Sequence, residues 1–137
     1  MKHLLDINVF IAAIYGGHAA HAPARAWLDK IKRQGWGIPV ETYLGAMRLL
    51  MNPVVMGDNV HGAAQAMDAI DAELGGAHPG RIIFATQKPS RSLPGKAQGH
   101  KQVMDLWLIQ IAQQERCKLA TSDAGMLTGW PDDTVKV

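Results

Sequence analysis

The chain has 137 residues, of which 47% are hydrophobic and 19% are charged, and we expect a single domain over residues 1–137. This composition excludes an intrinsically disordered chain, and a mean hydropathy of −0.05 excludes an integral membrane protein. The net charge of +2 is too small to indicate nucleic-acid binding by itself. Asp6 precedes any hydrophobic core of a signal peptide, so we expect a cytoplasmic protein without a membrane partner.

Hydrophobic periodicity predicts strands that alternate with helices. In chain order, we expect a buried strand and its exit over 2–9, a helix over 19–34, a strand over 37–40 and a helix over 41–51. A further helix runs from a cap at Asp58 or Asn59 to about Leu74, and its apolar stripe includes Val60, Met67 and Ile70. A strand over 81–85, a long polar loop over 87–100, the strongest helix over 101–116 and strands over 118–121 and 134–137 complete the chain. This alternation predicts an α/β fold with a mainly parallel sheet.

Three aspartates lie where a merely solvated acid is not expected. Asp6 follows the apolar pair Leu4-Leu5, and Asp123 follows the strand over 118–121. The carboxyl ends of parallel strands line the functional crevice of an open sheet, so both aspartates are expected to face it. Asp105 lies in a helix that is apolar nearly all round, so we expect its carboxylate to be protected from solvent. If this helix packs beside the strand ends, Asp105 lies near the other two aspartates. Converging carboxylates favour Mg²⁺ or Mn²⁺, which promote attack of water on a phosphodiester.

Each aspartate also has a structural interpretation. Asp6 can cap the helix that follows it, and Asp123 can cap the turn after the last buried strand. Asp105 can pair with Lys101, four residues earlier, or with a basic residue of another helix. Both interpretations stay open for each acid, and it is their joint placement that favours a metal site.

Three segments occur in a distinctive order: Leu4-Leu5-Asp6-Ile7-Asn8-Val9-Phe10-Ile11-Ala12, Gly99-His100-Lys101-Gln102-Val103-Met104-Asp105-Leu106-Trp107-Leu108, and Leu119-Ala120-Thr121-Ser122-Asp123. With Arg48 and Asn52-Pro53 between the first two, the chain resembles the PIN-domain ribonucleases, specifically the VapC-type toxins of bacterial toxin–antitoxin pairs. The resemblance implies a three-layer α/β/α domain with a central, mainly parallel sheet. It also implies an endoribonuclease toxin that is inhibited by a cognate antitoxin in a groove beside the active site, and a homodimer.

The resemblance also assigns roles to residues. Asp6, Asp105 and Asp123 are implied to be the catalytic acids that hold Mg²⁺ or Mn²⁺, while Asn8 and Thr121 match positions that support them. The family usually has a glutamate a few residues before the arginine that Arg48 matches. Here Glu41 lies seven residues before Arg48 and is the local candidate for a fourth catalytic acid, provided that its helix starts early. The alternative is an exposed glutamate at a helix N-terminus, where the helix dipole favours it.

The charge distribution adds a candidate RNA-binding segment. No acidic residue occurs between Glu73 and Asp105, where several basic residues lie. Charge alone favours a solvated basic loop, and the alternative is a surface that faces phosphates. With the resemblance, the candidates for guiding the RNA backbone are Arg91, Lys96 and Lys101.

Two other functions remain open on the sequence. One is a different Mg²⁺-dependent phosphoryl-transfer domain with Asp6 as the phosphoryl acceptor, although Ile7-Asn8 lacks the second acid that such a site favours. The other is a catalytically degenerate PIN-like module that binds RNA or protein, for which the displaced Glu41 is the main support.

Overall fold

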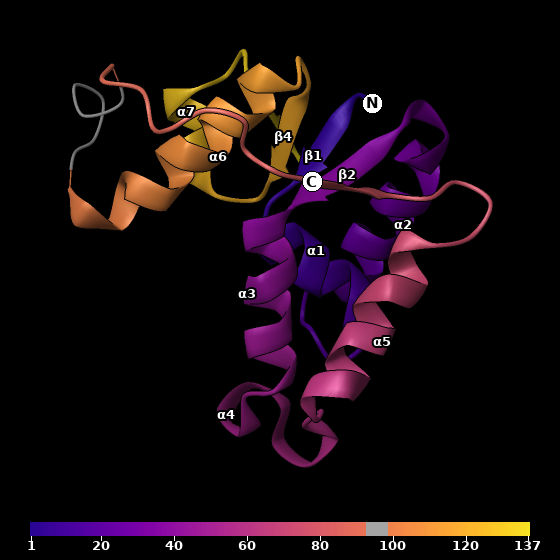
Figure 1. Ribbon diagram of the computed structural model, residues 1–137. Coiled ribbons are helices and arrows are strands. Elements are labelled where there is room, and N and C mark those ends of the chain that lie inside the picture. The colour runs from indigo at the N-terminus through magenta and orange to yellow at the C-terminus, as the bar shows by residue number, and fades with distance from the viewer. Residues whose placement is uncertain (93–98) are drawn as a thin grey trace.

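The computed structural model describes residues 1–92 and 99–137, and its sheet is parallel throughout these residues (Figure 1). The five strands are β1 (His3–Leu5), β2 (Trp36–Pro39), β3 (Arg81–Ile83), β4 (Lys118–Thr121) and β5 (Thr134–Lys136). Their order in the sheet is β3-β2-β1-β4-β5, so β1 lies at the centre and β3 and β5 form the edges. Leu5 of β1 is in register with Ala120 of β4, so these two strands end side by side.

Helices cover both faces of the sheet, which confirms the three-layer α/β/α arrangement. One layer contains α1 (Ile7–Ile14), α2 (His21–Ile31), α3 (Val40–Leu50) and α5 (Ala63–Leu74), and the short α4 (Pro53–Met56) follows α3. The other layer contains α6 (Val103–Gln114) and α7 (Ala124–Gly129). In Figure 1, α3 and α5 lie side by side with α4 at their far end, on the opposite side of the sheet from α6 and α7. None of the described helices is long and apolar enough to cross a membrane.

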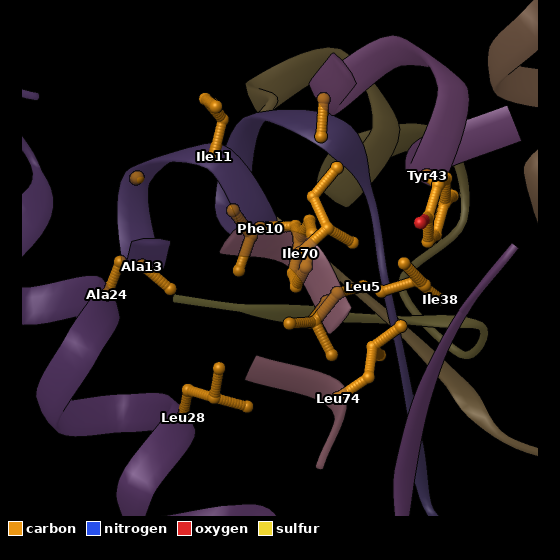
Figure 2. Close-up of a cluster of buried hydrophobic side chains, with 14 of the residues drawn as sticks. Leu5, Phe10, Ile11, Ala13, Ala24, Leu28, Ile38, Tyr43, Ile70 and Leu74 are labelled. Carbon is orange, nitrogen blue, oxygen red and sulfur yellow. The ribbon is translucent and has the colours of Figure 1, made fainter. Parts of the chain in front are cut away.

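Two hydrophobic cores hold these layers to the sheet. The larger joins Leu5 of β1 to Phe10 of α1, Leu28 of α2 and Ile70 of α5 (Figure 2). The smaller contains Leu4 of β1 together with apolar residues of α6, β4 and α7. Neighbouring side chains of a strand point to opposite faces, so the apolar pair Leu4-Leu5 serves both cores. Helix α1 lies between other helices and the sheet, and accordingly its residues 9–13 are all buried.

Several sequence expectations require correction. Residues 7–14 form α1, whereas the pattern predicts a strand exit to Val9, because the buried residues 9–13 are consecutive and lack amphipathic spacing. Helix α5 begins at Ala63 and not at Asp58 or Asn59, which lie in a 3-10 turn that begins at Gly57, whose φ is +56°. The apolar stripe of this segment is also narrower than expected, since Met67 and Val60 are exposed. Helices α4 and α7 are too short for periodicity to reveal.

The N-terminal turn of α6 also differs from the prediction of a helix buried all round. Val103 and Met104 are 61% and 52% exposed, and continuous burial against the smaller core begins only in the next turn. Asp105 therefore lies at the border between the exposed turn and the core, where its carboxylate is half-buried.

Candidate active site

Asp6 is held rigidly at the junction of β1 and α1. It is the N-cap of α1, and its Oδ1 accepts the backbone N–H of Val9 at 3.0 Å. Its Oδ2 accepts the hydroxyl of Thr121, and its own backbone N–H donates to the carbonyl of Ala120 at 3.1 Å. Only 3% of Asp6 is exposed. Asp6 therefore caps a helix, as one interpretation of the sequence predicts, and at the same time presents a buried carboxylate at the end of the central strand.

Thr121 connects Asp6 to the second aspartate. It is the last residue of β4 and is fully buried, and its Oγ1 accepts the backbone N–H of Asp123 at 3.1 Å while donating to Asp6. Asp123 is the N-cap of α7, with its Oδ1 accepting the N–H of Met126 at 2.8 Å. Thr121 thus donates to Asp6 and accepts from Asp123. The two strand-end acids each cap a helix, and they lie close enough for the charge of Asp123 to act on Asp6.

Asp105 approaches these two acids from α6. The pKa of its carboxyl lies above its ordinary value because of burial and because of the nearby charges of Asp123 and Asp6. The ion pairs found among the described residues all involve Arg25 or Lys32, so the alternative pairing of Asp105 with Lys101 is not observed there.

The pKa of Asp6 is raised for a related reason. Burial has the largest effect, hydrogen bonds from Thr121, Val9 and Asn8 oppose it, and the charge of Asp123 adds to it. The contribution of Asn8 comes from its backbone N–H, and the residue itself is exposed. Neighbouring acidic charges therefore destabilise the charged forms of Asp6 and Asp105, a condition that a bound cation relieves.

The donor set suits a hard divalent cation, although no finished cage is present. Asp6, Asp105 and Asp123 offer carboxylate oxygens, the ligands preferred by Mg²⁺ and Mn²⁺. Among the residues that the structure describes, no group of three or more His, Cys, Asp or Glu side chains is arranged so that it could hold a metal ion. Mg²⁺ commonly uses one or two carboxylates and keeps several waters, so the acids fit such an ion without a complete protein cage.

Glu41 is placed differently from the aspartates. It lies in the first turn of α3, half-buried rather than exposed, and its Oε1 accepts the indole N–H of Trp107 at 2.8 Å. Its Oε2 is buried, with no hydrogen-bond partner among the described residues. Trp107 is two residues after Asp105 on α6, so Glu41 contacts the helix that carries Asp105. The exposed-glutamate interpretation is therefore wrong.

Two hollows flank the start of α1 and meet at Asn8. One, of about 420 Å³, lies between α1, α2 and the turn at 122–124, and Asp123 forms part of its wall. The other, of about 350 Å³, lies between α1 and α3 and is lined by Arg48 and Asn52, among others. Gly45 allows this close packing, because a Cβ there would lie 2.3 Å from the Ile7 side chain. In the sequence, Arg48 is noticed only because it matches a position of the family resemblance. The two hollows could not be predicted from the sequence.

The basic segment is attached to α6 by two glutamines one turn apart. Gln114 accepts the N–H of Thr86 at 3.0 Å and donates to the carbonyl of Phe84 at 3.3 Å. Gln110 accepts the N–H of Ser90 at 2.8 Å and donates to the carbonyl of Lys88 at 3.0 Å. The loop therefore runs toward the N-terminal end of α6, where Asp105 lies. Arg91 and Lys101 are exposed, and Lys96 lies outside the described residues.

The family comparisons agree with this fold. A model of the PIN domain family matches residues 3–127, a span that includes all three aspartates. The chain belongs to the PIN domain family. The VapC-type resemblance is also confirmed: ribonuclease VapC38 of Mycobacterium tuberculosis is 29% identical to this PIN domain over 126 residues, covering 91% of this chain and 87% of the relative. Ribonuclease VapC39 of the same species is 30% identical over 131 residues, covering 92% of this chain and 91% of the relative.

A solved structure shares the fold of this PIN domain. It is VapBC2 from Rickettsia felis bound to a DNA fragment from their promoter. The TM-score is 0.59 at 13% sequence identity, and the match covers 100% of this chain and 98% of that chain. At this identity the likeness concerns the fold, which agrees with the parallel sheet and its two helical layers.

Proposed function

We propose that this PIN domain is the toxin of a type II toxin–antitoxin pair and acts as an Mg²⁺- or Mn²⁺-dependent endoribonuclease. The observation that carries the proposal is the convergence of Asp6, Asp105 and Asp123: the charge of Asp123 raises the pKa of Asp6, and the charges of Asp123 and Asp6 raise that of Asp105. Among the described residues, no ion pair gives these acids a basic partner. The relatives named ribonuclease VapC support the reaction class, since they align with most of this chain.

In this proposal the three aspartates hold the ion, which when bound lowers the pKa of water and neutralises charge that develops on the phosphate. Thr121 and the N–H of Val9 fix the Asp6 carboxylate, so that it does not have to be ordered when substrate arrives. Asp123 keeps one oxygen on the α7 cap. Within the described part of the chain, no ion pair restrains the Asp105 carboxylate, so this is the acid that would turn toward the ion.

The surroundings of the acids support binding of RNA. Arg91 and Lys101 are exposed near α6, and Arg48 is exposed on the other side of Asn8. Cations on both sides of an acidic centre attract the phosphodiester backbone while leaving the acids to hold the metal. We retain Lys96 as a candidate for the same role, from its position in the sequence.

The proposal includes a protein partner and a cellular setting. We infer that a cognate antitoxin inhibits the enzyme by occupying a groove beside the aspartates, and a VapBC assembly among the solved structures with this fold supports such a partner. We also infer a homodimer in the cytoplasm, in which two active sites share one basic groove.

Brief induction in cells followed by transcript-wide mapping of RNA 5′ ends tests the function directly. The wild type is expected to create discrete new ends, and Asp6→Asn is expected to create none. Asp58→Asn, which changes an exposed acid in the turn after α4, serves as the matched control and should behave as wild type. The same ends in Asp6→Asn would overturn the proposed site. If purified wild type with Mn²⁺ cleaves none of several RNAs, the PIN domain is a binding module.

A further inference from the structure

The hollow between α1 and α2 has the composition of a small binding site next to the aspartates. Its floor is formed by small apolar side chains, including those of Val9, Ala12 and Ala24. Its rim carries polar groups, among them Asn8, His18 and Asp123, beside the exposed apolar residues Ala20 and Pro23. A volume of about 420 Å³ with an apolar floor and a few polar groups is typical of sites for small organic groups.

Asp123 connects this hollow to the acidic centre. Its Oδ1 caps α7, its charge acts on Asp6 and Asp105, and its side chain forms part of the wall of the hollow. A group seated in the hollow is therefore a direct neighbour of whatever the aspartates bind. For a polymer held at the aspartates through its phosphate, that neighbour is an attached part of the same or the next nucleotide.

We propose that the hollow is a subsite for one unpaired nucleobase of the RNA, adjacent to the bond that is cleaved. This inference rests on the proposed function, and it adds the substrate feature that the site recognises. The apolar floor contacts the face of the base, while the rim faces its hydrogen-bonding edge. Sequence-specific proteins commonly read RNA in this way, by binding bases that are turned out of single-stranded segments.

The rim groups offer both donors and acceptors. His18 Nδ1 accepts the backbone N–H of Ala20 at 3.0 Å, so the neutral ring carries its proton on Nε2 and donates from there. The exposed amide of Asn8 both donates and accepts. The edge of a nucleobase also carries both donors and acceptors and can pair with His18 and Asn8. An apolar side chain of a protein partner would leave the polar groups of these two residues without hydrogen bonds. The polar rim therefore favours a base as the occupant.

Binding measurements on the cleavage-deficient Asp105→Asn variant test the subsite without depending on catalysis. The probes are fluorescently labelled single-stranded oligoribonucleotides of A, C, G and U, each compared with an abasic oligoribonucleotide of the same length. At least one base is expected to bind about tenfold more tightly than the abasic probe, in the range seen when single bases are held by proteins.

Filling the hollow should remove that preference. Ala20 lines the rim and is exposed, so Ala20→Phe places a ring over the hollow without disturbing the core. With this change all five probes should bind equally, whereas Ala26→Phe, at an exposed position of α2 outside the hollow, should retain the preference. Retained discrimination in Ala20→Phe would overturn the subsite, as would equal binding of all probes by the starting variant.

Three further outcomes distinguish failure of the subsite from failure of the proposed function. If wild type cleaves RNA but removal of the base changes neither binding nor cleavage, the proposed function stands and the subsite is wrong. If Ala20→Phe leaves base discrimination intact and weakens inhibition by the antitoxin, the hollow is a pocket for a protein side chain, and the inference fails. If wild type cleaves nothing, the proposed function fails, and the binding data still decide whether a base is held.

Discussion

The Asp105 carboxylate has no hydrogen bond or ion pair within the described part of the chain, and two other aspartates lie near it. Its folded-state pKa is raised by burial first, and then by the charges of Asp123 and Asp6. An acid with a raised pKa binds its proton more readily in the folded state than in the unfolded state. Its charged form therefore destabilises the fold above the raised pKa, and this penalty disappears as the pH falls below the unfolded value.

Asp105→Asn is accordingly expected to stabilise the metal-free protein while it abolishes cleavage. The free energy of unfolding should rise by about 0.5–2 kcal/mol at neutral pH, as for other substitutions that relieve a functional site. Urea denaturation in EDTA measures this difference, which should narrow as the pH is lowered toward the ordinary pKa of an aspartate. A less stable variant at neutral pH would show that Asp105 has a stabilising partner in the fold.

Asp6 and Asp123 show why single acids are hard to interpret from sequence. Each was open to two interpretations, a helix cap or a member of a metal site, and the structure shows that one carboxylate oxygen of each makes the cap. The capping bond orients the side chain, so the two interpretations are compatible. The sequence indicates both residues because each follows a buried strand. It does not show which oxygen of each carboxylate makes which hydrogen bond, because these bonds depend on how β1 and β4 pair.

At the scale of secondary-structure elements, the hydrogen bond between Glu41 and Trp107 connects α3 to α6. Helix α3 packs in the larger core and Trp107 packs against the smaller one, so this bond joins the two helical layers. We infer that Glu41 positions the N-terminal part of α6, and with it Asp105. No sequence signal reveals this pair, because the two residues are 66 positions apart.

Replacement of Glu41 by glutamine separates positioning from metal binding. The amide oxygen of Gln still accepts from Trp107, so Glu41→Gln should keep RNA cleavage within about tenfold of wild type, whereas Glu41→Ala and Trp107→Phe should lower it further. Initial rates on one RNA with Mn²⁺ provide the measurement. A loss in Glu41→Gln as complete as that in Asp105→Asn would instead make Glu41 a fourth catalytic acid.

The attachment of the basic loop to α6 gives a second prediction at this scale. Gln110 and Gln114 hold the backbone of residues 84–90 through four hydrogen bonds. Their replacement by alanine should free the loop that carries Arg91 and weaken RNA binding several-fold, because ordering the loop then costs conformational entropy. Fluorescence anisotropy with a labelled RNA measures this change. Gln113→Ala, on the same helix and bonded to Asp133, is the matched control and should bind as wild type does.

If the double variant binds RNA with unchanged affinity, the loop does not contribute to the RNA surface. The solvated interpretation of the basic segment would then hold. The charge of this segment and its polar loop are visible in the sequence. The glutamine contacts could not be predicted from it, since these depend on a loop and a helix that meet only in the folded chain.

At the scale of the whole molecule, topology explains how a near-neutral chain acquires a concentrated acidic centre. The sheet order places β1 beside β4. Asp6 and Asp123, which are 117 positions apart in the sequence, therefore lie together at the carboxyl ends of these two strands. Alternation of strands and helices was enough to predict the fold class, and the resemblance supplied the layers. The helices that periodicity missed are α1, whose residues 9–13 are all buried, and the short α4 and α7. Three features could not be predicted from the sequence because they arise from tertiary packing: the two hollows, the contact between Glu41 and Trp107, and the attachment of the basic loop to α6.

RNA cleavage by purified protein, with and without a divalent ion, tests the central claim most directly. We predict that wild type cleaves a susceptible RNA with Mn²⁺ and not in EDTA, and that Asp105→Asn lowers the rate at least about a hundredfold under the same conditions. Asp58→Asn, the exposed-acid control, should cleave as wild type does. Cleavage that continues unchanged in Asp105→Asn, or that persists in EDTA, would contradict the assignment of these aspartates to a metal-dependent ribonuclease site.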